Sequence, residues 1–219
     1  MNKLFLFVAL ATLTFTTTTA QSEFRIGFKG GVNISSIAGD DYYGALNPLA
    51  GFHLGGLVEI PLAGKFSVQP ELLYSSQGSK YDTFFGIQLW NNKEKVVLDY
   101  INLPIMGKYY IIKGLSVELG PQIGILVSAH NKGSDEEGSF NIDSKDKYTD
   151  LDVAIGVSAS YRLNNGIFFS LRYNKGLMDI SDYDYKPIPY GGDGSGDGYP
   201  SYSYKNQNNV FQISTGYSF

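Results

Sequence analysis

The chain has 219 residues, which suits one domain or two small ones, and its 17 basic and 21 acidic side chains give a net charge of −4. This mild acidity gives no support for nucleic-acid binding, which requires clustered Lys and Arg. The lack of Cys excludes disulfide scaffolds, zinc–thiolate sites, thiol catalysis and lipid attachment at a cysteine. The 17 Tyr, 14 Phe and 26 Gly residues favour strands joined by tight turns.

Residues 1–20 have the composition of a secretory signal peptide. Lys3 supplies a positive charge, residues 4–13 are apolar, and Thr18 and Ala20 give the small-residue pattern of a cleavage site. A buried N-terminal helix is the alternative, but the threonines at 16–19 make a poor helix end. We therefore expect export, cleavage after Ala20 and a mature domain of residues 21–219. No later segment has the ~18 consecutive apolar residues of a transmembrane helix.

Eight later segments alternate apolar and polar residues with a period of two, which is the pattern of a strand with two different faces. No segment has a convincing helical pattern, and Asn164-Asn165-Gly166 is a hairpin signal. The alternating segments are residues 24–35, 51–60, 66–75, 100–111, 115–127, 151–162, 167–174 and 211–219.

The connections between these segments alternate in length. Tight turns at 61–64, 112–114 and 163–166 separate long connections at about 36–48, 79–96, 131–149 and 175–208. Outer-membrane barrels have short periplasmic turns and long extracellular loops, and an even number of strands closes the sheet without an edge. The sequence therefore predicts an all-β fold, an eight-stranded antiparallel up-and-down transmembrane β-barrel in the outer membrane.

The two rows of side chains on these segments differ in charge. The apolar row carries none, as hydrocarbon requires, because a charge facing lipid at the bilayer midplane costs ~2–4 kcal/mol. A water-soluble barrel would show the inverse arrangement. Eight strands leave an interior that side chains just fill, so we expect a plugged polar core in which basic and acidic groups pair. This predicted interior charge network is Arg25, Lys29, Glu59, Glu71, Lys108, Glu118, Asp152, Arg162 and Arg172.

Several short motifs recur along the segments. They are Gly30-Gly31-Val32-Asn33, QPELLYS at 69–75, YINLPI at 100–105, LGPQIG at 119–124, Arg172-Tyr173-Asn174 and Tyr217-Ser218-Phe219. Together they resemble the outer-membrane β-barrel domain family, the PorT-like or porin-family proteins of Gram-negative bacteria, over nearly all of residues 22–219. The resemblance implies location and architecture, and it does not imply transport.

Three prolines lie inside the predicted strands, at Pro70, Pro104 and Pro121. Each removes a hydrogen bond from the ladder between strands. They belong to the same family pattern, and we expect β-bulges at these positions.

A catalytic set is a weak alternative. Ser128 and His130 fall on the inward row at the outer end of a strand, with Asp152 as a candidate third member. Such a set at a barrel rim would suit an outer-membrane lipid hydrolase. Polar residues beside a loop are the simpler interpretation, so we predict no enzyme. We likewise interpret His53, on an inward row, as a hydrogen-bonded interior residue.

The long connections carry two further patterns. Asp193, Ser195 and Asp197 match the opening of a calcium loop, but Tyr204 stands where the bidentate Glu belongs. We therefore predict a surface loop and no metal or other cofactor, and we interpret Asp135-Glu136-Glu137 as a solvated loop face. The second pattern is a crowd of aromatic rings that suits either recognition or packing on the rim: Tyr183, Tyr185, Tyr190, Tyr199, Tyr202 and Tyr204.

These features favour a structural or surface-interaction barrel that acts through extracellular loops. The alternatives are a small-solute channel or a component of a secretion or uptake assembly, and more remotely an outer-membrane lipid hydrolase. The expected partners are outer-membrane lipid, the barrel assembly machinery and an extracellular or secretion-system protein. No nucleic-acid partner is expected.

The C-terminal segment predicts an assembly signal. An aromatic residue ends the chain and apolar residues precede it on the same row, as in the signal that outer-membrane assembly machinery reads: Phe211, Ile213, Tyr217 and Phe219. Deleting Phe219 should therefore block insertion in cells while leaving refolding in micelles intact, because burial of one Phe contributes only ~1.5–3 kcal/mol.

The measurements are heat-modifiable gel mobility after insertion in cells and after refolding in detergent. Normal insertion in cells would contradict the signal role. Failure in both settings would show that Phe219 matters for folding itself.

Overall fold

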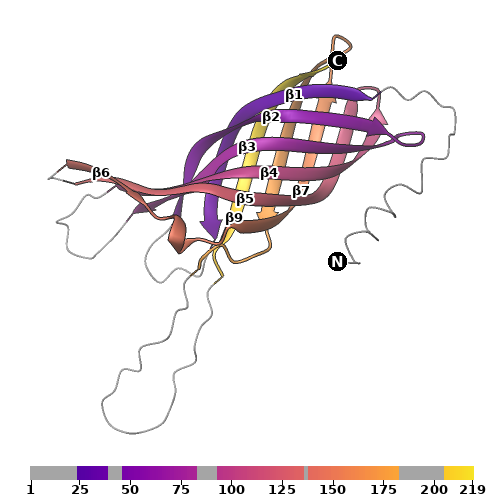
Figure 1. Ribbon diagram of the computed structural model, residues 1–219. Coiled ribbons are helices and arrows are strands. Elements are labelled where there is room, and N and C mark those ends of the chain that lie inside the picture. The colour runs from indigo at the N-terminus through magenta and orange to yellow at the C-terminus, as the bar shows by residue number, and fades with distance from the viewer. Residues whose placement is uncertain (1–23, 39–45, 83–92, 136–137, 183–204) are drawn as a thin grey trace, which may run out of the picture.

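The computed structural model describes residues 24–38, 46–82, 93–135, 138–182 and 205–219 (Figure 1). The predicted signal peptide and the candidate calcium loop lie outside the described residues. The elements are β1 (Arg25–Ala38), β2 (Leu46–Pro61), β3 (Phe66–Asp82), β4 (Lys93–Ile112), β5 (Leu115–Asp135), β6 (Gly138–Asp143), a 3-10 turn η1 (Lys145–Lys147), β7 (Leu151–Arg162), β8 (Ile167–Gly176) and β9 (Gln207–Ser218).

Eight of the nine described strands form a closed ring. The order is β1, β2, β3, β4, β5, β7, β8, β9, with β9 returning to β1, and every neighbouring pair is antiparallel. The predicted eight-stranded up-and-down barrel is confirmed. The remaining strand, β6, pairs with β5 outside the ring. Among the described residues, no helix is long and apolar enough to cross a membrane.

The two ends of the barrel differ. The β2–β3, β4–β5 and β7–β8 turns lie at one end, which we call the turn end, and the long connections lie at the other, the loop end (Figure 1). The turn predicted at 164–166 is confirmed: Gly166 has φ +90° and its N–H donates to the Leu163 carbonyl at 3.2 Å. This positive φ is the left-handed conformation that glycine adopts without steric cost.

All four long connections predicted as loops are partly strand, most extensively those at 79–96 and 131–149. β3 continues to Asp82, β4 begins at Lys93, and β5 continues to Asp135 before the chain returns as β6. The alternation of apolar and polar side chains fades there because the sheet has left the lipid and no hydrocarbon requires it. The backbone hydrogen bonds continue regardless, so a sheet of these strands projects beyond the barrel rim.

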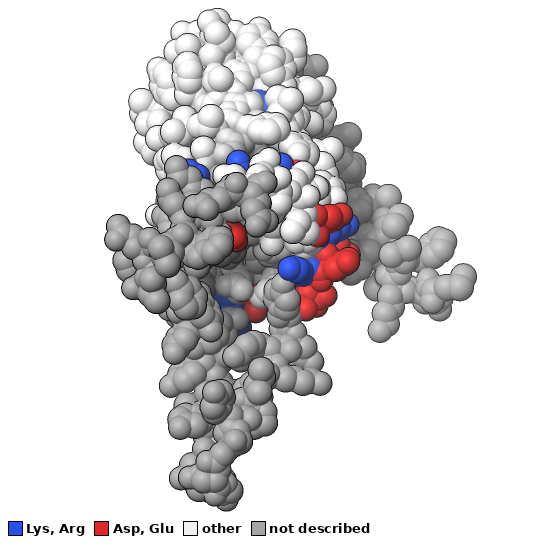
Figure 2. Space-filling view, turned by 90° about the vertical axis from the view of Figure 1, so that its left-hand side faces the viewer, with Lys and Arg blue, Asp and Glu red and all other residues white. Residues whose placement is uncertain are grey.

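The predicted orientation of the two rows is also observed. Outward side chains are apolar and exposed, such as Leu72 and Leu119 at 59% each, whereas Asn33, Ser75 and Ser116 are completely buried inside. In Figure 2 the upper part of the molecule is largely free of charge, and Lys, Arg, Asp and Glu gather toward the lower, loop end. Apolar side chains outside and polar side chains inside are the reverse of the arrangement in a soluble protein, as a lipid environment requires.

The expectation of bulges at the three strand prolines is wrong. Pairing of β3 with β4 runs to Pro70 opposite Ile105 and resumes at Leu73 opposite Asn102 in the same register. Pairing on both sides of Pro104 and of Pro121 also keeps its register. A missing N–H removes one hydrogen bond but inserts no residue, so the ladder is interrupted and not shifted.

The C-terminal strand closes the barrel at the turn end. The Phe219 N–H donates to the Ile26 carbonyl at 2.8 Å, and the Tyr217 and Phe219 rings meet edge to face with centroids 5.1 Å apart. The centroid of the Phe28 ring of β1 lies 6.4 Å from the centroids of both rings. Phe211 and Ile213 continue the same outward row. The role of these residues as an assembly signal stays a prediction.

Candidate functional site

The centre of the barrel holds a buried carboxylate bound by two cations. Glu71 of β3 accepts two hydrogen bonds from the Arg172 guanidinium of β8, at 2.7 and 2.8 Å, and pairs with Lys29 of β1 at 2.7 Å. All three side chains are at most 2% exposed. The two-point Arg–carboxylate contact is the strong, directional form of an ion pair.

Glu118 of β5 extends this arrangement toward the turn end. It contacts Arg172 at 3.3 Å and Lys108 of β4 at 3.2 Å. The hydroxyls of Ser158 and Ser160 on β7 donate to its two oxygens at 2.5 and 2.7 Å. Both carboxylate oxygens therefore have partners, which a buried charge requires.

Glu59 of β2 completes the sequence of ion pairs. It contacts Lys108 at 3.5 Å and Arg25 at 2.9 Å and accepts a hydrogen bond from the Tyr110 hydroxyl at 2.6 Å. The result is one continuous set of ion pairs through the lumen, drawn from six strands. We call it the ion-pair chain: Lys29, Glu71, Arg172, Glu118, Lys108, Glu59 and Arg25.

Two of the nine predicted charges stay outside this chain. Asp152 lies nearer the loop end, where it accepts a hydrogen bond from Asn208 at 2.9 Å. Arg162 lines the cavity at the turn end and makes no ion pair with the described residues. Both are on the inward rows, but strand position separates them from the central carboxylates.

A layer of polar side chains lies on the loop-end side of the ion-pair chain. His53 of β2 hydrogen-bonds Asn33 and Ser214, at 2.8 Å each, and is 1% exposed. Asn33 in turn contacts Ser75 at 3.0 Å and accepts from Gln212 at 3.0 Å. His53 is therefore a hydrogen-bonded interior residue, and this layer links β1, β2, β3 and β9.

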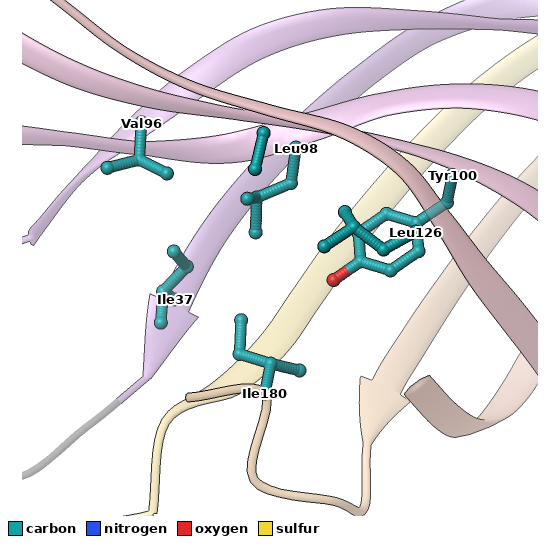
Figure 3. Packing of buried hydrophobic residues seen from close by; sticks show 7 residues of the cluster. Ile37, Val96, Leu98, Tyr100, Leu126 and Ile180 are labelled. Atoms are coloured by element: carbon teal, nitrogen blue, oxygen red, sulfur yellow. The ribbon is translucent and has the colours of Figure 1, made fainter. Parts of the chain in front are cut away.

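The loop end of the lumen is apolar, which the sequence did not predict. Ile180, in the segment after β8, is fully buried against side chains from β1, β4 and β5 (Figure 3). Its backbone N–H donates to the Asn206 carbonyl, and its carbonyl accepts from Thr149, both at 2.9 Å. We call this group the loop-end cluster: Ile37, Val96, Leu98, Tyr100, Leu126, Ala129 and Ile180.

This cluster has only a faint signal in the sequence. Val96 and Leu98 precede the segment predicted as a strand, and Ile180 is an isolated apolar residue in a polar connection. The position of Ile180 depends on the neighbouring Asp179. The Asp179 carboxylate accepts hydrogen bonds from the backbone N–H groups of Ser181 and Asn206, at 3.0 and 3.1 Å, and these bonds hold the segment across the barrel mouth.

Little free space remains beside the ion-pair chain. The cavity at the turn end has a volume of about 10 Å³ and is lined by Glu59, Lys108, Glu118 and Arg162, among others. A volume of this size holds about one water molecule.

The placement of Ser128 and His130 on the inward row is wrong. The pairing of β4 with β5 shifts between Asp99 and Tyr100, so that Val127 has no partner in that ladder. This bulge reverses which face the following residues of β5 present. Ser128 Oγ lies 2.9 Å from His130 Nδ1 on the outward face, whereas Asp152 points into the lumen.

The aromatic crowd of 183–204, the calcium-loop candidates Asp193, Ser195 and Asp197, and Glu136-Glu137 lie outside the described residues. Within the described ranges, no three His, Asp or Glu side chains are grouped to hold a metal ion.

The chain matches the model of one protein family. The family described as "Outer membrane protein beta-barrel domain" matches residues 19–182. Among curated proteins, none matches the chain.

Three solved structures are among those similar to this chain. Ail, the attachment invasion locus protein of Yersinia pestis, is 14% identical over 90% of this chain and 99% of that chain, with a TM-score of 0.47. A major outer membrane protein from Thermus thermophilus is 13% identical over 90% and 100%, with a TM-score of 0.45. Neisserial surface protein A is 9% identical over 90% and 97%, with a TM-score of 0.44.

The ion-pair chain yields a prediction about stability. Arg172→Met removes the cation shared by Glu71 and Glu118 and with it the hydrogen bonds that offset the burial of both carboxylates, which should lower the free energy of unfolding by about 3–5 kcal/mol. The matched variant Arg162→Met removes no ion pair and should change it by less than about 1 kcal/mol. Urea unfolding in detergent micelles, followed by circular dichroism, measures both. Equal midpoints for Arg172→Met and the unaltered protein would contradict the prediction.

Proposed function

The chain belongs to the outer membrane protein β-barrel domain family, as its motifs predicted, and on that premise we propose that its barrel is closed to solutes and that the projecting sheet binds partners outside the cell. The family places the protein in the outer membrane. The closed interior and the role of the sheet are the proposal.

The observation that carries the proposal is the filling of the lumen in three layers. The ion-pair chain connects six strands at the centre and the turn end, with room for about one water beside it. The polar layer around His53 follows, and the loop-end cluster covers it. A solute would have to break buried ion pairs and displace Ile180 to pass, so the interior supports a structural role over a channel.

The projecting sheet supports a role in surface interaction. β3, β4, β5 and β6 continue beyond the barrel rim, and an open cleft of about 880 Å³ lies against them with Glu94, Ser139 and Phe140 among its lining residues. Polar and aromatic side chains on a rigid sheet provide contacts at low entropic cost, as binding surfaces require.

The hydrolase interpretation has less support. The Ser128–His130 hydrogen bond is present, but no carboxylate of the described residues lies within ion-pair distance of His130. The Asp143 carboxylate, on the neighbouring strand, instead accepts the Lys145 backbone N–H at 3.0 Å. A serine nucleophile needs a histidine that is oriented by a third group.

Conductance measurements test the closed interior. The purified protein in a planar lipid bilayer should give no stepwise conductance at either polarity, because buried side chains fill the lumen at all three layers. A porin in the same bilayer is the positive control. Reproducible single-channel steps from the unaltered protein would overturn the closed barrel and favour the channel.

Cysteine labelling tests which end faces outward. The sequence contains no Cys, so Ser139→Cys in β6 and Asn165→Cys in the β7–β8 turn each introduce a single thiol. A membrane-impermeant maleimide should label Ser139→Cys in intact cells and Asn165→Cys only after the outer membrane is permeabilised. The reverse pattern would show that the sheet faces the periplasm and would refute its role at the cell surface.

A further inference from the structure

Three lysines lie directly opposite one another on adjacent strands of the projecting sheet. The register pairs Lys80 of β3 with Lys95 of β4, and Lys95 with Lys132 of β5. Asn47 of β2 and Asn141 of β6 continue the row on its two sides. Like charges directly opposite in a sheet are destabilising, so this row requires an explanation beyond folding.

The lysine row, Lys80, Lys95 and Lys132, faces outward. Residues directly opposite in a sheet share a face, and successive residues of a strand alternate between faces. Val96, next to Lys95, is buried in the loop-end cluster inside the barrel. Lys95 and its two partners therefore lie on the face that continues, toward the turn end, into the lipid-exposed surface.

The position of the row relative to the lipid-exposed surface is also defined. Ile101 is on the same outward row of β4 and begins its apolar part, which continues through Leu103 and Ile105. Lys95 comes six residues before Ile101, which is about 15 Å along the barrel axis for a strand tilted by ~40°. This places the lysine backbone on the outer side of the hydrocarbon, from which the long side chains can extend toward the lipid headgroups.

Within the part of the chain that the structure describes, no protein group neutralises the row. Lys80, Lys95 and Lys132 make no ion pair there, whereas each lysine inside the barrel has a carboxylate within 3.5 Å. On the outward face, Asp99 lies four residues after Lys95 along β4, toward the membrane. The carboxylate of Asp143 accepts a hydrogen bond from the Lys145 backbone N–H. Glu94 lines the same open cleft as the three lysines, but its side chain packs against Gly133 and makes no ion pair with them.

We propose that Lys80, Lys95 and Lys132 form a binding site for phosphate groups on lipid headgroups of the outer leaflet. Adjacent strands lie ~4.8 Å apart, so the three ammonium groups can meet several oxygens of one phosphorylated headgroup. Each ammonium has three donors and a compact charge, which suits phosphate. The bound anion removes the repulsion within the row and fixes the sheet against the membrane surface.

Lipid binding by the full-length protein in neutral detergent tests the site. The probes are diphosphorylated lipid A and dephosphorylated lipid A, and native mass spectrometry counts the bound molecules across a titration. The unaltered protein should retain the diphosphorylated lipid. The variant Lys80→Gln/Lys95→Gln/Lys132→Gln should bind it at least tenfold more weakly, and Lys→Arg at the same three positions should restore most of the binding.

The control removes three other lysines of the loop end, as Lys145→Gln/Lys147→Gln/Lys205→Gln, of which Lys147 and Lys205 are exposed and Lys145 pairs with Asp150 at 3.6 Å; this variant should bind within twofold of the unaltered protein. Equal losses in both triple variants would overturn the site, because they would show general surface charge. Inorganic phosphate that competes as well as the lipid at equal concentration would overturn the lipid assignment in favour of a free anion. Undiminished binding by the first triple variant would refute the proposal outright.

A second measurement separates binding from folding. Without phosphorylated lipid, the Lys80→Gln/Lys95→Gln/Lys132→Gln variant should resist urea at least as well as the unaltered protein, because three opposed charges are gone. Added diphosphorylated lipid A should then stabilise only the unaltered protein. If the variant unfolds at lower urea without lipid, the lysines act in folding and the binding site is refuted.

Discussion

Every peptide N–H and C=O within the hydrocarbon must be paired by the protein itself, because an unpaired group there costs several kcal/mol. The pairing of β9 with β1 and of β4 with β5 meets this constraint by removing both edges of the sheet. The rest of the structure depends on that closure. A closed sheet has one lipid face and one lumen face, so alternate residues must be apolar outside and must fill a narrow space inside.

The filling of that space explains the ion-pair chain. Moving charges out of water costs several kcal/mol per ion, and only close, fully hydrogen-bonded contacts offset the cost. Arg172 achieves this through a two-point contact with Glu71 and a further contact with Glu118. Since these residues come from β8, β3 and β5, their contacts tie together strands that are not neighbours in the sheet. Closure of the sheet and filling of the lumen therefore reinforce each other.

The constraint ends where the lipid ends, and there the distribution of polar and apolar side chains between the two faces changes. Beyond the rim the outward face carries the lysine row, and the apolar side chains move inside as the loop-end cluster. The inversion required by lipid is thus partly reversed toward the arrangement of a soluble protein. A bulge at Val127 lies at this transition and reverses the faces of the following β5 residues.

The sequence alone determined the barrel, because alternation with a period of two is a local property that each strand carries by itself. It placed the eight strands, the turn at Gly166, the lipid-facing row and the inward positions of the nine charges. Which charges meet was decided by the register between strands. Glu71 and Arg172 are 101 residues apart, and nothing in either segment specifies the other.

The same limit explains the errors. Asp152 shares an inward row with the ion-pair chain but lies nearer the loop end, and Arg162 lines the turn-end cavity beside Glu59 and Lys108 without an ion pair to a described residue. The face on which Ser128 lies depends on Val127, which has no partner in the β4–β5 ladder. The prolines interrupt the pairing of strands without shifting its register. Ile180 is a single apolar residue in a polar segment, and only the folded barrel mouth gives it a place. Local patterns determine faces, whereas contacts between distant strands exist only once the ring has closed.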